Sequence, residues 1–286
     1  MKDIFVRALH SINDHSTLID FRPVSGGDIN EAYILRTEKQ EYFFKYRKNP
    51  PENFFKLEQT GLETIKITNT IAVPTVFARE ENGRYGYLLM EWIEGKRTNI
   101  TSEMLGRNLA AMHQWTGHGF GYSEDTYIGT LIQPNGFYDN WIDYYRERRL
   151  LPQMNKAYEN QYFSLEFRKK CEKLLEQLDK WLPYKIIPSL LHGDLWGGNW
   201  ITGKNGTPYL IDPSILYGDY EFEIAFTELF GGFPRKFYQA YNEVMPLSPE
   251  YPERKPLYHL YYLLVHLNLF GTSYLGSVAR IVNHYI

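Results

Sequence analysis

An eleven-residue stretch, LLHGDLWGGNW at residues 190–200, places polar side chains among apolar residues and glycines. Its aspartate and asparagine, Asp194 and Asn199, are five positions apart. A third polar residue, Asp212, follows thirteen positions later, at the end of the short apolar run YLI. Oxygen-bearing side chains isolated beside apolar runs suit a site that moves a proton or binds a hard cation.

Two more charged residues interrupt apolar patterns earlier in the chain. Glu58 falls on the apolar face of the helix expected at residues 52–67, and a carboxylate on a packing face requires a cation. Lys45, in the aromatic-rich run EYFFKYR, is the nearest candidate. Taken alone, these two residues would be as consistent with a structural role, as an ion pair or as a lysine whose ammonium group reaches solvent, as with a functional one.

Together these residues match the requirements of phosphoryl transfer from ATP. That reaction needs a carboxylate to deprotonate the attacking hydroxyl, oxygen ligands for Mg²⁺ and a cation for the phosphates. Asp194 would be the catalytic base, and Asn199 and Asp212 the Mg²⁺ ligands. Lys45, held by Glu58, would contact the phosphates. The spacing H-x-D-x-x-x-x-N is a weak signal alone, and it becomes strong only in combination with the others.

Two further segments could contact the nucleotide. The loop SGGDIN lies between two expected strands and could present backbone N–H groups to phosphates through Gly26, Gly27 and Asn30. Taken alone, that loop is simply a hairpin with glycines. The end of a later strand could offer free backbone groups to adenine through Met90, Glu91, Trp92 and Ile93. Neither a P-loop nor a G-x-G-x-x-G motif occurs, which excludes those two nucleotide-binding classes.

The pattern that must position these residues changes near residue 95. Alternating and aromatic-rich strands are expected at 17–24, 31–37, 41–47, 75–80 and 84–92, with the helix 52–67 among them. Helical spacing dominates from Thr101 onward. We therefore predict an α+β, two-lobed architecture. Residues 1–94 would form a small nucleotide-binding lobe with an antiparallel sheet and one helix. Residues 95–286 would form a larger, mainly helical lobe with the catalytic loop and the substrate site.

Composition excludes several classes of function. Lys and Arg number 31 against 34 Asp and Glu, and no long run of one sign occurs, so we expect neither nucleic acid nor a membrane surface as a partner. The single cysteine, Cys171, lies on an apolar helical stripe and indicates a core position in a reducing compartment. No signal peptide or membrane span is evident. We expect a cytoplasmic protein.

The histidines suggest structural roles rather than a metal site. His113 and His118 lack cysteine or aspartate companions at ligand spacing, so a place in the core or at the surface is favoured for both. His192 is expected to fix the catalytic loop by hydrogen bonding, because Asp194 already has the role of base.

Six segments, in chain order, carry a family resemblance: SGGDINEAY, YFFKYR, FFKLEQTGLETI, LLMEWIEG, LLHGDLWGGNW and LIDPSILYGDYEFEIAFTELFGGF. With them, nearly the whole chain resembles the fructosamine (ketosamine) 3-kinase family, within the aminoglycoside-phosphotransferase-like and protein-kinase-like enzymes. The H-G-D and I-D-P segments are shared with aminoglycoside and choline kinases. HGDLWGGN together with DPSILYGDYEFEIA is what points to ketosamine kinases.

The resemblance implies a bilobal protein-kinase-like fold and ATP-dependent phosphorylation of the sugar 3-hydroxyl of a free or protein-bound ketosamine. Such a 3-phosphate is labile, so the amine would be restored, which is a deglycation or repair role. The resemblance implies the same base, Mg²⁺ ligands and phosphate-binding pair as above, with Gly26, Gly27 and Asn30 as the phosphate loop. Many relatives have cysteine where Asp28 stands, a position tied to redox-sensitive dimers, which argues against that regulation here.

Substrate contacts and alternatives complete the expectations. Trp196 and the acidic residues Asp219, Glu221 and Glu223 could contact the sugar and its cationic amine. Asp219 and Glu223 could equally brace the catalytic loop. A kinase for an aminoglycoside or a choline-like alcohol is the alternative among enzymes. A catalytically inactive, nucleotide-binding scaffold is the alternative from another class, and the presence of the full set of candidate catalytic residues argues against it.

Overall fold

The computed structural model describes residues 1–24 and 30–286, and contacts divide the chain into two compact units. The first unit contains Met1–Leu105 and Asn199–Pro213, and the second contains Gly106–Gly198 and Ser214–Ile286. From the sequence pattern, residues 199–213 were expected in the second lobe; by their contacts they group with the first unit. The candidate Mg²⁺ ligands therefore belong to the unit that carries the N-terminal sheet.

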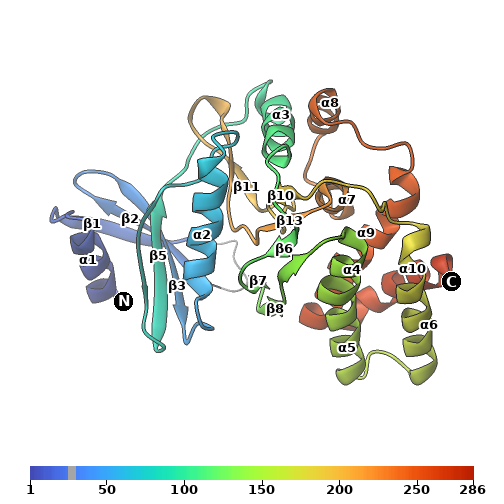
Figure 1. Ribbon diagram of the computed structural model, residues 1–286. Coiled ribbons are helices and arrows are strands. Elements are labelled where there is room, and N and C mark those ends of the chain that lie inside the picture. The colour runs from blue at the N-terminus through green and yellow to red at the C-terminus, as the bar shows by residue number, and fades with distance from the viewer. Residues whose placement is uncertain (25–29) are drawn as a thin grey trace. The chain divides into compact units, whose positions relative to one another are not determined.

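The sheet of the first unit is five-stranded and antiparallel, in the order β1-β2-β3-β5-β4 (Figure 1). Its strands agree with the expected ones: β1 (Leu18–Pro23), β2 (Glu31–Thr37), β3 (Glu41–Lys48), β4 (Val76–Glu81) and β5 (Tyr85–Glu91). The helix α2 (Phe54–Ile67) packs against β4 and β5. Gly86 lies so close to the Phe55 ring that a β-carbon on it would come within 2.9 Å, so a larger residue would push this helix away.

The first unit has a second helix, which corrects the expectation of a single one in this part of the chain. This helix, α1 (Lys2–Ser11), buries Phe5 and Leu9 against aromatic and leucine side chains of the sheet. Tyr42 and Phe44 of β3 lie in that same core cluster. Because side chains alternate along a strand, Lys45 points to the face opposite Tyr42 and Phe44.

Residues 199–213 form a small hairpin with the strands β11 (Trp200–Thr202) and β12 (Pro208–Leu210). Leu210 N–H donates to the Ala72 carbonyl at 2.9 Å. Gly95 approaches the hairpin so closely that a β-carbon on it would lie 1.9 Å from the Gly203 carbonyl oxygen. These contacts explain why the hairpin belongs to the first unit, although about a hundred residues separate it from the rest of that unit.

The second unit is mainly helical, as expected. Its helices are α4 (Trp141–Tyr144), a π-helix (Tyr145–Leu150), α5 (Leu151–Glu159), α6 (Leu165–Glu176), α7 (Tyr220–Leu229), α8 (Arg235–Val244), α9 (Tyr251–Phe270) and α10 (Leu275–Tyr285). The helix α3 (Thr101–His113) begins in the first unit and ends in the second. Short 3₁₀ turns occur at Leu178–Lys180, Lys204–Gly206 and Thr272–Tyr274.

Short strands add a second sheet that the sequence pattern did not indicate. Four of them pair in the order β10-β13-β6-β9: β10 (Ser189–Leu191), β13 (Leu216–Gly218), β6 (Phe120–Tyr122) and β9 (Gly136–Tyr138). The strands β7 (Thr126–Ile128) and β8 (Leu131–Gln133) pair separately. Each has three residues, too few for a recognisable alternation of side chains.

Many aromatic side chains are buried in the core of the second unit. The helices α7 and α9 pack together, with Phe222 stacked on Tyr262 at 5.0 Å between ring centroids. Trp141 and Tyr258 are joined by a hydrogen bond from the indole to the hydroxyl. Buried tyrosines thus contribute apolar area and also supply hydroxyl groups to interior polar partners.

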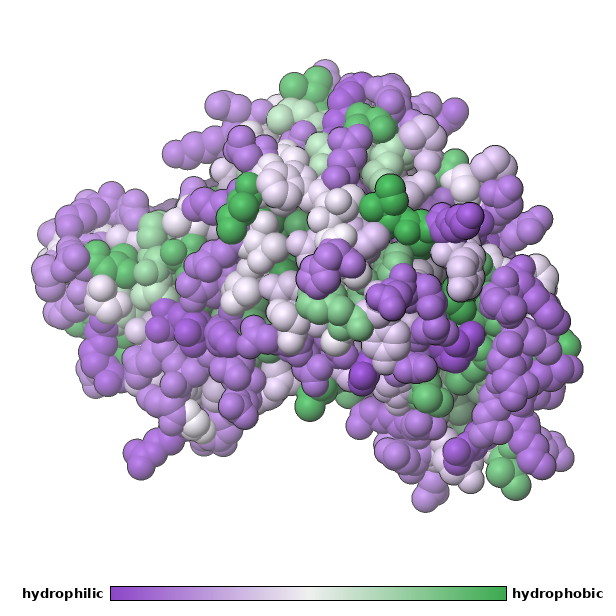
Figure 2. All heavy atoms as spheres, in the orientation of Figure 1, coloured by the Kyte–Doolittle hydropathy of each residue, from purple (hydrophilic) through white to green (hydrophobic). Residues whose placement is uncertain are grey.

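The face of the molecule seen in Figure 2 is mostly polar. Figure 2 shows a face covered mostly by hydrophilic residues, with hydrophobic ones exposed singly or in small groups. Among the helices in the part of the chain that the structure describes, none combines the length and hydropathy that crossing a membrane requires. Cys171 is buried in α6, as expected.

Candidate active site

Lys45 lies at the centre of a charged cluster in the first unit. Its Nζ donates to Glu58 Oε1 at 2.7 Å, which is the expected ion pair. The same Nζ also donates to Asp212 Oδ1. The strand β3, the helix α2 and the end of the β11–β12 hairpin each supply one member of this cluster. Residues far apart in the sequence are therefore brought together as the phosphoryl-transfer hypothesis requires.

Burial and charge oppose each other in this cluster. Burial alone would lower the pKa of Lys45, but the carboxylates of Asp212 and Glu58 outweigh it and raise the pKa well above its usual range. Burial raises the pKa of Glu58, an effect that the Lys45 charge opposes. Two carboxylates thus share one ammonium group.

Asp212 combines backbone strain with an accessible side chain. Its φ of 56° is in the left-handed region, which costs free energy for a residue other than glycine. Its side chain is 41% exposed, whereas that of Lys45 is 8% exposed. The neighbouring Ile211 N–H donates to the Asn199 carbonyl at 3.0 Å. The two candidate Mg²⁺ ligands are thus attached to hydrogen-bonded segments of one unit.

The donor chemistry of these two residues fits Mg²⁺. A carboxylate and an amide carbonyl are hard oxygen donors, and Mg²⁺ is usually held by one or two protein groups together with phosphate oxygens and water. Among the described residues, no group of three or more His, Cys, Asp and Glu side chains could hold a metal by itself.

The loop with Asp194 lies in the second unit, directly after β10. Both N–H groups before Asp194 donate to the Glu223 carboxylate, from His192 at 3.1 Å and from Gly193 at 2.6 Å. The Asp194 N–H donates to His192 Nδ1 at 3.3 Å. His192 therefore fixes the loop by hydrogen bonding, as expected from the sequence. Asp194 itself is half-buried.

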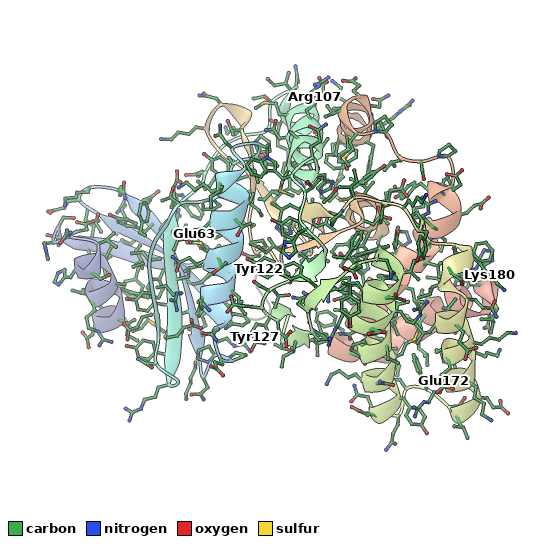
Figure 3. The ribbon with its side chains drawn as sticks, viewed as in Figure 1. Glu63, Arg107, Tyr122, Tyr127, Glu172 and Lys180 are labelled. Carbon is green, nitrogen blue, oxygen red and sulfur yellow. The ribbon has the colours of Figure 1, made fainter. Side chains whose placement is uncertain are left out.

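The carbonyl groups of this loop also have partners. The His192 carbonyl accepts from Ser214 N–H at 2.8 Å, and the Gly193 carbonyl accepts from the Tyr262 hydroxyl at 3.0 Å. Ser214 is held in turn through its hydroxyl, which donates to the carbonyl of Tyr127, a residue labelled in Figure 3. The backbone that leads into Asp194 is therefore anchored on both its donor and its acceptor sides.

Glycines shape the rest of the loop. Gly193 has a φ of 84°, and a β-carbon on it would lie 1.9 Å from the Ser214 carbonyl oxygen. Gly198 lies against Trp196, so that a β-carbon on Gly198 would lie 2.4 Å from the Trp196 ring. Trp196 is still 44% exposed. Its indole is thus supported by the loop and accessible to solvent, which suits the predicted contact with a substrate.

The acidic residues proposed near the substrate are buried and have partners inside the protein. Asp219 caps α7 by accepting from Glu221 N–H and also accepts from the Tyr258 hydroxyl. Glu221 accepts from Arg254 Nη1 at 2.6 Å. Glu223 braces the catalytic loop, as the alternative interpretation foresaw. Contacts of Asp219 and Glu223 with a substrate stay predictions, and the observed partners favour the bracing role.

The electrostatic environment differs between these two carboxylates. Burial and the nearby Glu221 raise the pKa of Asp219 to about 6, against the hydrogen bond from Tyr258. Burial by itself would raise the pKa of Glu223. Several interactions outweigh burial, the hydrogen bond and the charge of His113 being the largest of them, so the pKa of Glu223 lies below its ordinary value. Glu223 is therefore ionised at neutral pH.

The segments expected to contact the nucleotide are only partly described. Gly26, Gly27 and Asp28 lie outside the described residues, and Asn30 is half-buried directly after them. Met90 and Glu91 end β5. The Glu91 N–H donates to the Thr75 carbonyl.

Beyond this strand the chain continues through Trp92 and Ile93. In the described part of the chain, no hydrogen bond involves the backbone groups of these two residues. Their predicted contact with adenine, like that of Met90 and Glu91, stays a prediction.

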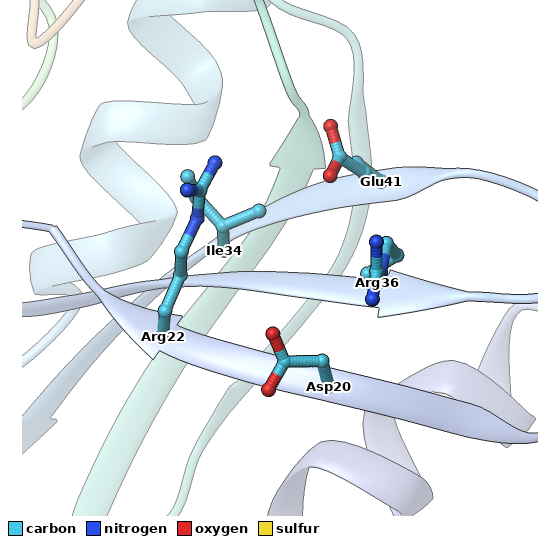
Figure 4. A pocket seen from close by; sticks show the side chains of 5 residues that line it. All are labelled: Asp20, Arg22, Ile34, Arg36 and Glu41. Carbon is cyan, nitrogen blue, oxygen red and sulfur yellow. The ribbon is translucent and has the colours of Figure 1, made fainter.

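A shallow pocket lies on the same face of the sheet as Lys45. Figure 4 shows its lining by side chains of β1, β2 and β3: Asp20, Arg22, Ile34, Arg36 and Glu41. Ala32 pairs with Lys45, and Ile34 and Arg36 lie two and four positions after Ala32, so all share one face. None of the residues proposed from the sequence lines this pocket.

Three contacts of the catalytic loop region were missed from the sequence. Tyr262 holds the Gly193 carbonyl, while His113 and Tyr241 extend the Glu223 network. No short motif or spacing connects them to Asp194, since they come from three different helices. Only the buried histidine in the AAMH segment of α3 offered a signal, and its type alone favours a structural role.

Comparisons with known proteins identify relatives named as ketoamine kinases. A probable ketoamine kinase of Enterococcus faecium is 39% identical over 92% of this chain and 94% of its own. The chloroplastic protein-ribulosamine 3-kinase of Arabidopsis thaliana is 36% identical over 92% of this chain and 81% of its own. Both relatives match well beyond the catalytic loop, so the likeness extends over almost the entire chain.

Solved structures agree as well. A putative fructosamine-3-kinase from Thermobifida fusca has a TM-score of 0.88 and 28% identity, covering 99% of this chain and 98% of its own. The aminoglycoside phosphotransferase APH(4)-Ia, at 17% identity and a TM-score of 0.64 over 99% and 98% of the chains, shares the kinase-like fold. The expected fold class is thereby confirmed. The family model described as fructosamine kinase matches residues 2–286. This chain belongs to the fructosamine kinase family.

Proposed function

We propose that this protein transfers the γ-phosphoryl group of ATP to the 3-hydroxyl of ketosamines of the fructosamine or ribulosamine type. The observation that carries the proposal is the buried cluster in which Lys45 is shared by Glu58 and Asp212. Family membership and the names of the relatives, which include a ketoamine kinase and a ribulosamine 3-kinase, support the substrate class.

The proposed chemistry assigns one role to each candidate residue. Asp194 accepts the proton of the sugar hydroxyl while the hydroxyl oxygen attacks the γ-phosphorus; the new P–O bond forms as the bond to ADP breaks. Lys45, oriented by Glu58, binds the nucleotide phosphates. Asn199 and Asp212 would hold Mg²⁺, which neutralises phosphate charge when bound.

Further contacts complete the proposal. The glycine loop with Gly26, Gly27 and Asn30 covers the phosphates, and the backbone of residues 90–93 receives the adenine. Trp196 provides an aromatic surface for the sugar and its amine. The phosphorylated adduct then breaks down and releases the amine, which makes the reaction a repair of glycated amines, free or on a protein.

A substrate panel tests this proposal. Mg·ATP consumption is measured with a free ribulosamine, a free fructosamine and a glycated protein, beside an aminoglycoside and choline. We expect turnover with one or more of the ketosamines and none with the aminoglycoside or choline. Phosphorus NMR of the product should place the phosphate on the 3-oxygen. Preferred turnover of the aminoglycoside or choline would assign a different acceptor. Absence of turnover with every compound would favour a nucleotide-binding scaffold.

A further inference from the structure

The Glu223 carboxylate connects the catalytic loop to two helices on its other side. It accepts from the N–H groups of His192 and Gly193, and its Oε2 also lies 2.8 Å from His113 Nε2. His113 Nδ1 lies 2.6 Å from the Tyr241 hydroxyl. Glu223 and His113 are fully buried, and Tyr241 is 1% exposed. Three buried side chains and two backbone N–H groups are therefore linked in one hydrogen-bonded network.

The chemistry of Glu223 sets the direction of its hydrogen bond with His113. An ionised Glu223 can only accept, so His113 Nε2 must carry a proton and donate it. Burial raises the pKa of Tyr241 far above its usual range, so this hydroxyl keeps its proton; it donates to Nδ1 of a neutral imidazole and accepts from Nδ1–H of a charged one. The tyrosine thus orients the imidazole, and the imidazole orients the carboxylate. Loss of either leaves a buried acceptor incompletely satisfied, which is costly.

Close packing of two helices maintains this geometry. His113 ends α3 and Tyr241 lies in α8. Gly106 of α3 is so near α8 that a β-carbon on it would lie 2.3 Å from the Phe237 carbonyl oxygen. The distance between the helices at this point leaves no room for a side chain. The imidazole and the phenol are consequently held by backbone packing as well as by their hydrogen bond.

We propose that His113 and Tyr241 are positioning residues for the catalytic loop. By fixing the Glu223 carboxylate, they hold the two N–H groups that precede Asp194 and keep the base in one conformation. They contact neither the base nor a substrate, so their effect is on turnover rather than on binding of ATP. The consequence for turnover rests on the proposed kinase function, whereas the consequence for loop order does not.

The test compares matched variants. Tyr241→Phe removes the hydroxyl that orients the imidazole, and Tyr238→Phe, in the same helix, removes the hydroxyl of a half-buried tyrosine that accepts from the Thr227 hydroxyl. His113→Leu removes both hydrogen bonds of the imidazole, whereas His113→Gln can restore a donor toward Glu223. Each variant is assayed by thermal unfolding, by hydrogen exchange of the peptide containing His192 and Gly193, and by kcat and KM for ATP.

We expect faster exchange of the loop peptide in Tyr241→Phe and His113→Leu, and wild-type exchange in Tyr238→Phe. Misplacing a catalytic group typically costs up to about 100-fold in rate, so kcat should fall between about 10-fold and about 100-fold in His113→Leu, with KM for ATP unchanged. His113→Gln should recover part of this loss. A variant that destabilises the fold without selective exchange at the loop, or equal effects of Tyr238→Phe and Tyr241→Phe, would overturn the proposal.

Exchange separates this proposal from the proposed function. If the wild-type protein turns over none of the ketosamines but the loop exchanges faster in the two network variants, the positioning network stands and the reaction assignment fails. If the wild-type protein is an active ketosamine kinase and exchange at the loop is unchanged in both variants, the function stands and the positioning role is wrong.

Discussion

At the scale of single residues, the candidate site assigns proton transfer and phosphate binding to side chains with different surroundings. Asp194 is half-buried and follows a fully hydrogen-bonded backbone, whereas Lys45 is buried between two carboxylates. A base needs access to its substrate, and a phosphate-binding cation needs a fixed position. Each residue therefore has the surroundings that its proposed role requires.

Asp194→Asn should remove most turnover and leave nucleotide binding intact. A general base typically contributes about 10²–10⁴-fold, and kcat should fall by a factor in that range because asparagine cannot accept the hydroxyl proton. Titration with Mg·ATP, followed by intrinsic fluorescence, checks that affinity is retained. Asp179→Asn, which changes an exposed aspartate of the same unit, is the control. Wild-type turnover in Asp194→Asn would end the assignment of this base.

Asp219→Asn should change how stability depends on pH. Its pKa is raised from 3.8 to about 6 in the folded protein, so the folded state binds this proton more tightly than the unfolded chain. The resulting stabilisation is complete below pH 3.8 and is lost as the pH rises to about 6. Asparagine keeps an oxygen to cap α7 but cannot ionise.

Urea unfolding of the two proteins at several pH values measures this effect. The free energy of unfolding of Asp219→Asn should improve relative to wild type between about pH 4 and about pH 7. The magnitude is reduced by the compensating hydrogen bond from Tyr258. A difference in unfolding free energy that does not vary with pH would show that Asp219 ionises equally in both states.

At the scale of elements, close backbone approaches decide where the functional loops lie. Gly193 turns the catalytic loop against Ser214, and Gly95 lets the β11–β12 hairpin approach the segment after β5. Both are places where a β-carbon would meet a carbonyl oxygen rather than a flexible side chain. Substitution there must move backbone, and the functional residues attached to that backbone would move with it.

Gly193→Ala should therefore reduce both stability and turnover. A φ of 84° together with the contact to the Ser214 carbonyl should cost about 1–3 kcal/mol in free energy of unfolding. The loss of stability would by itself leave the protein folded at assay temperature and would barely change kcat. Displacement of Asp194 should therefore lower kcat further. Gly276→Ala, in α10 with open space around it, is the matched control and should be neutral or slightly stabilising. Equal behaviour of the two variants would contradict the role of Gly193.

At the scale of the whole molecule, the chain leaves the first unit and returns to it. Residues 199–213 rejoin Met1–Leu105 after an excursion through the second unit. The candidate phosphate-binding lysine and the candidate Mg²⁺ ligands consequently share one unit, although some 150 positions separate them in the sequence. Nucleotide binding should thus protect both parts of the first unit, β3 and residues 199–213, from hydrogen exchange.

Hydrogen exchange with Mg·ADP tests that expectation. Peptides from β3 and from residues 199–213 should both become protected, because Lys45 and the pair Asn199 and Asp212 contact the same ligand. Removing Mg²⁺ with a chelator should weaken protection mainly at residues 199–213. Protection confined to β3, with or without the metal, would contradict the assignment of Asn199 and Asp212.

The sequence by itself determined the local features of this protein. The position of Glu58 on an apolar helical face predicted its ion pair with Lys45. Period and residue type are local properties, so they can be recognised without the fold. The chain pattern also sufficed for the strand-rich first part, the helical second part and the family resemblance.

Only the tertiary structure decided which distant residues meet. It added Asp212 to the Lys45 pair and moved residues 199–213 into the first unit. It also gave Glu223 to the catalytic loop and linked that carboxylate to His113. These contacts depend on how whole helices and strands pack and on close backbone contacts at single glycines. The packing energy is summed over many residues, so it produces no periodic pattern in the sequence.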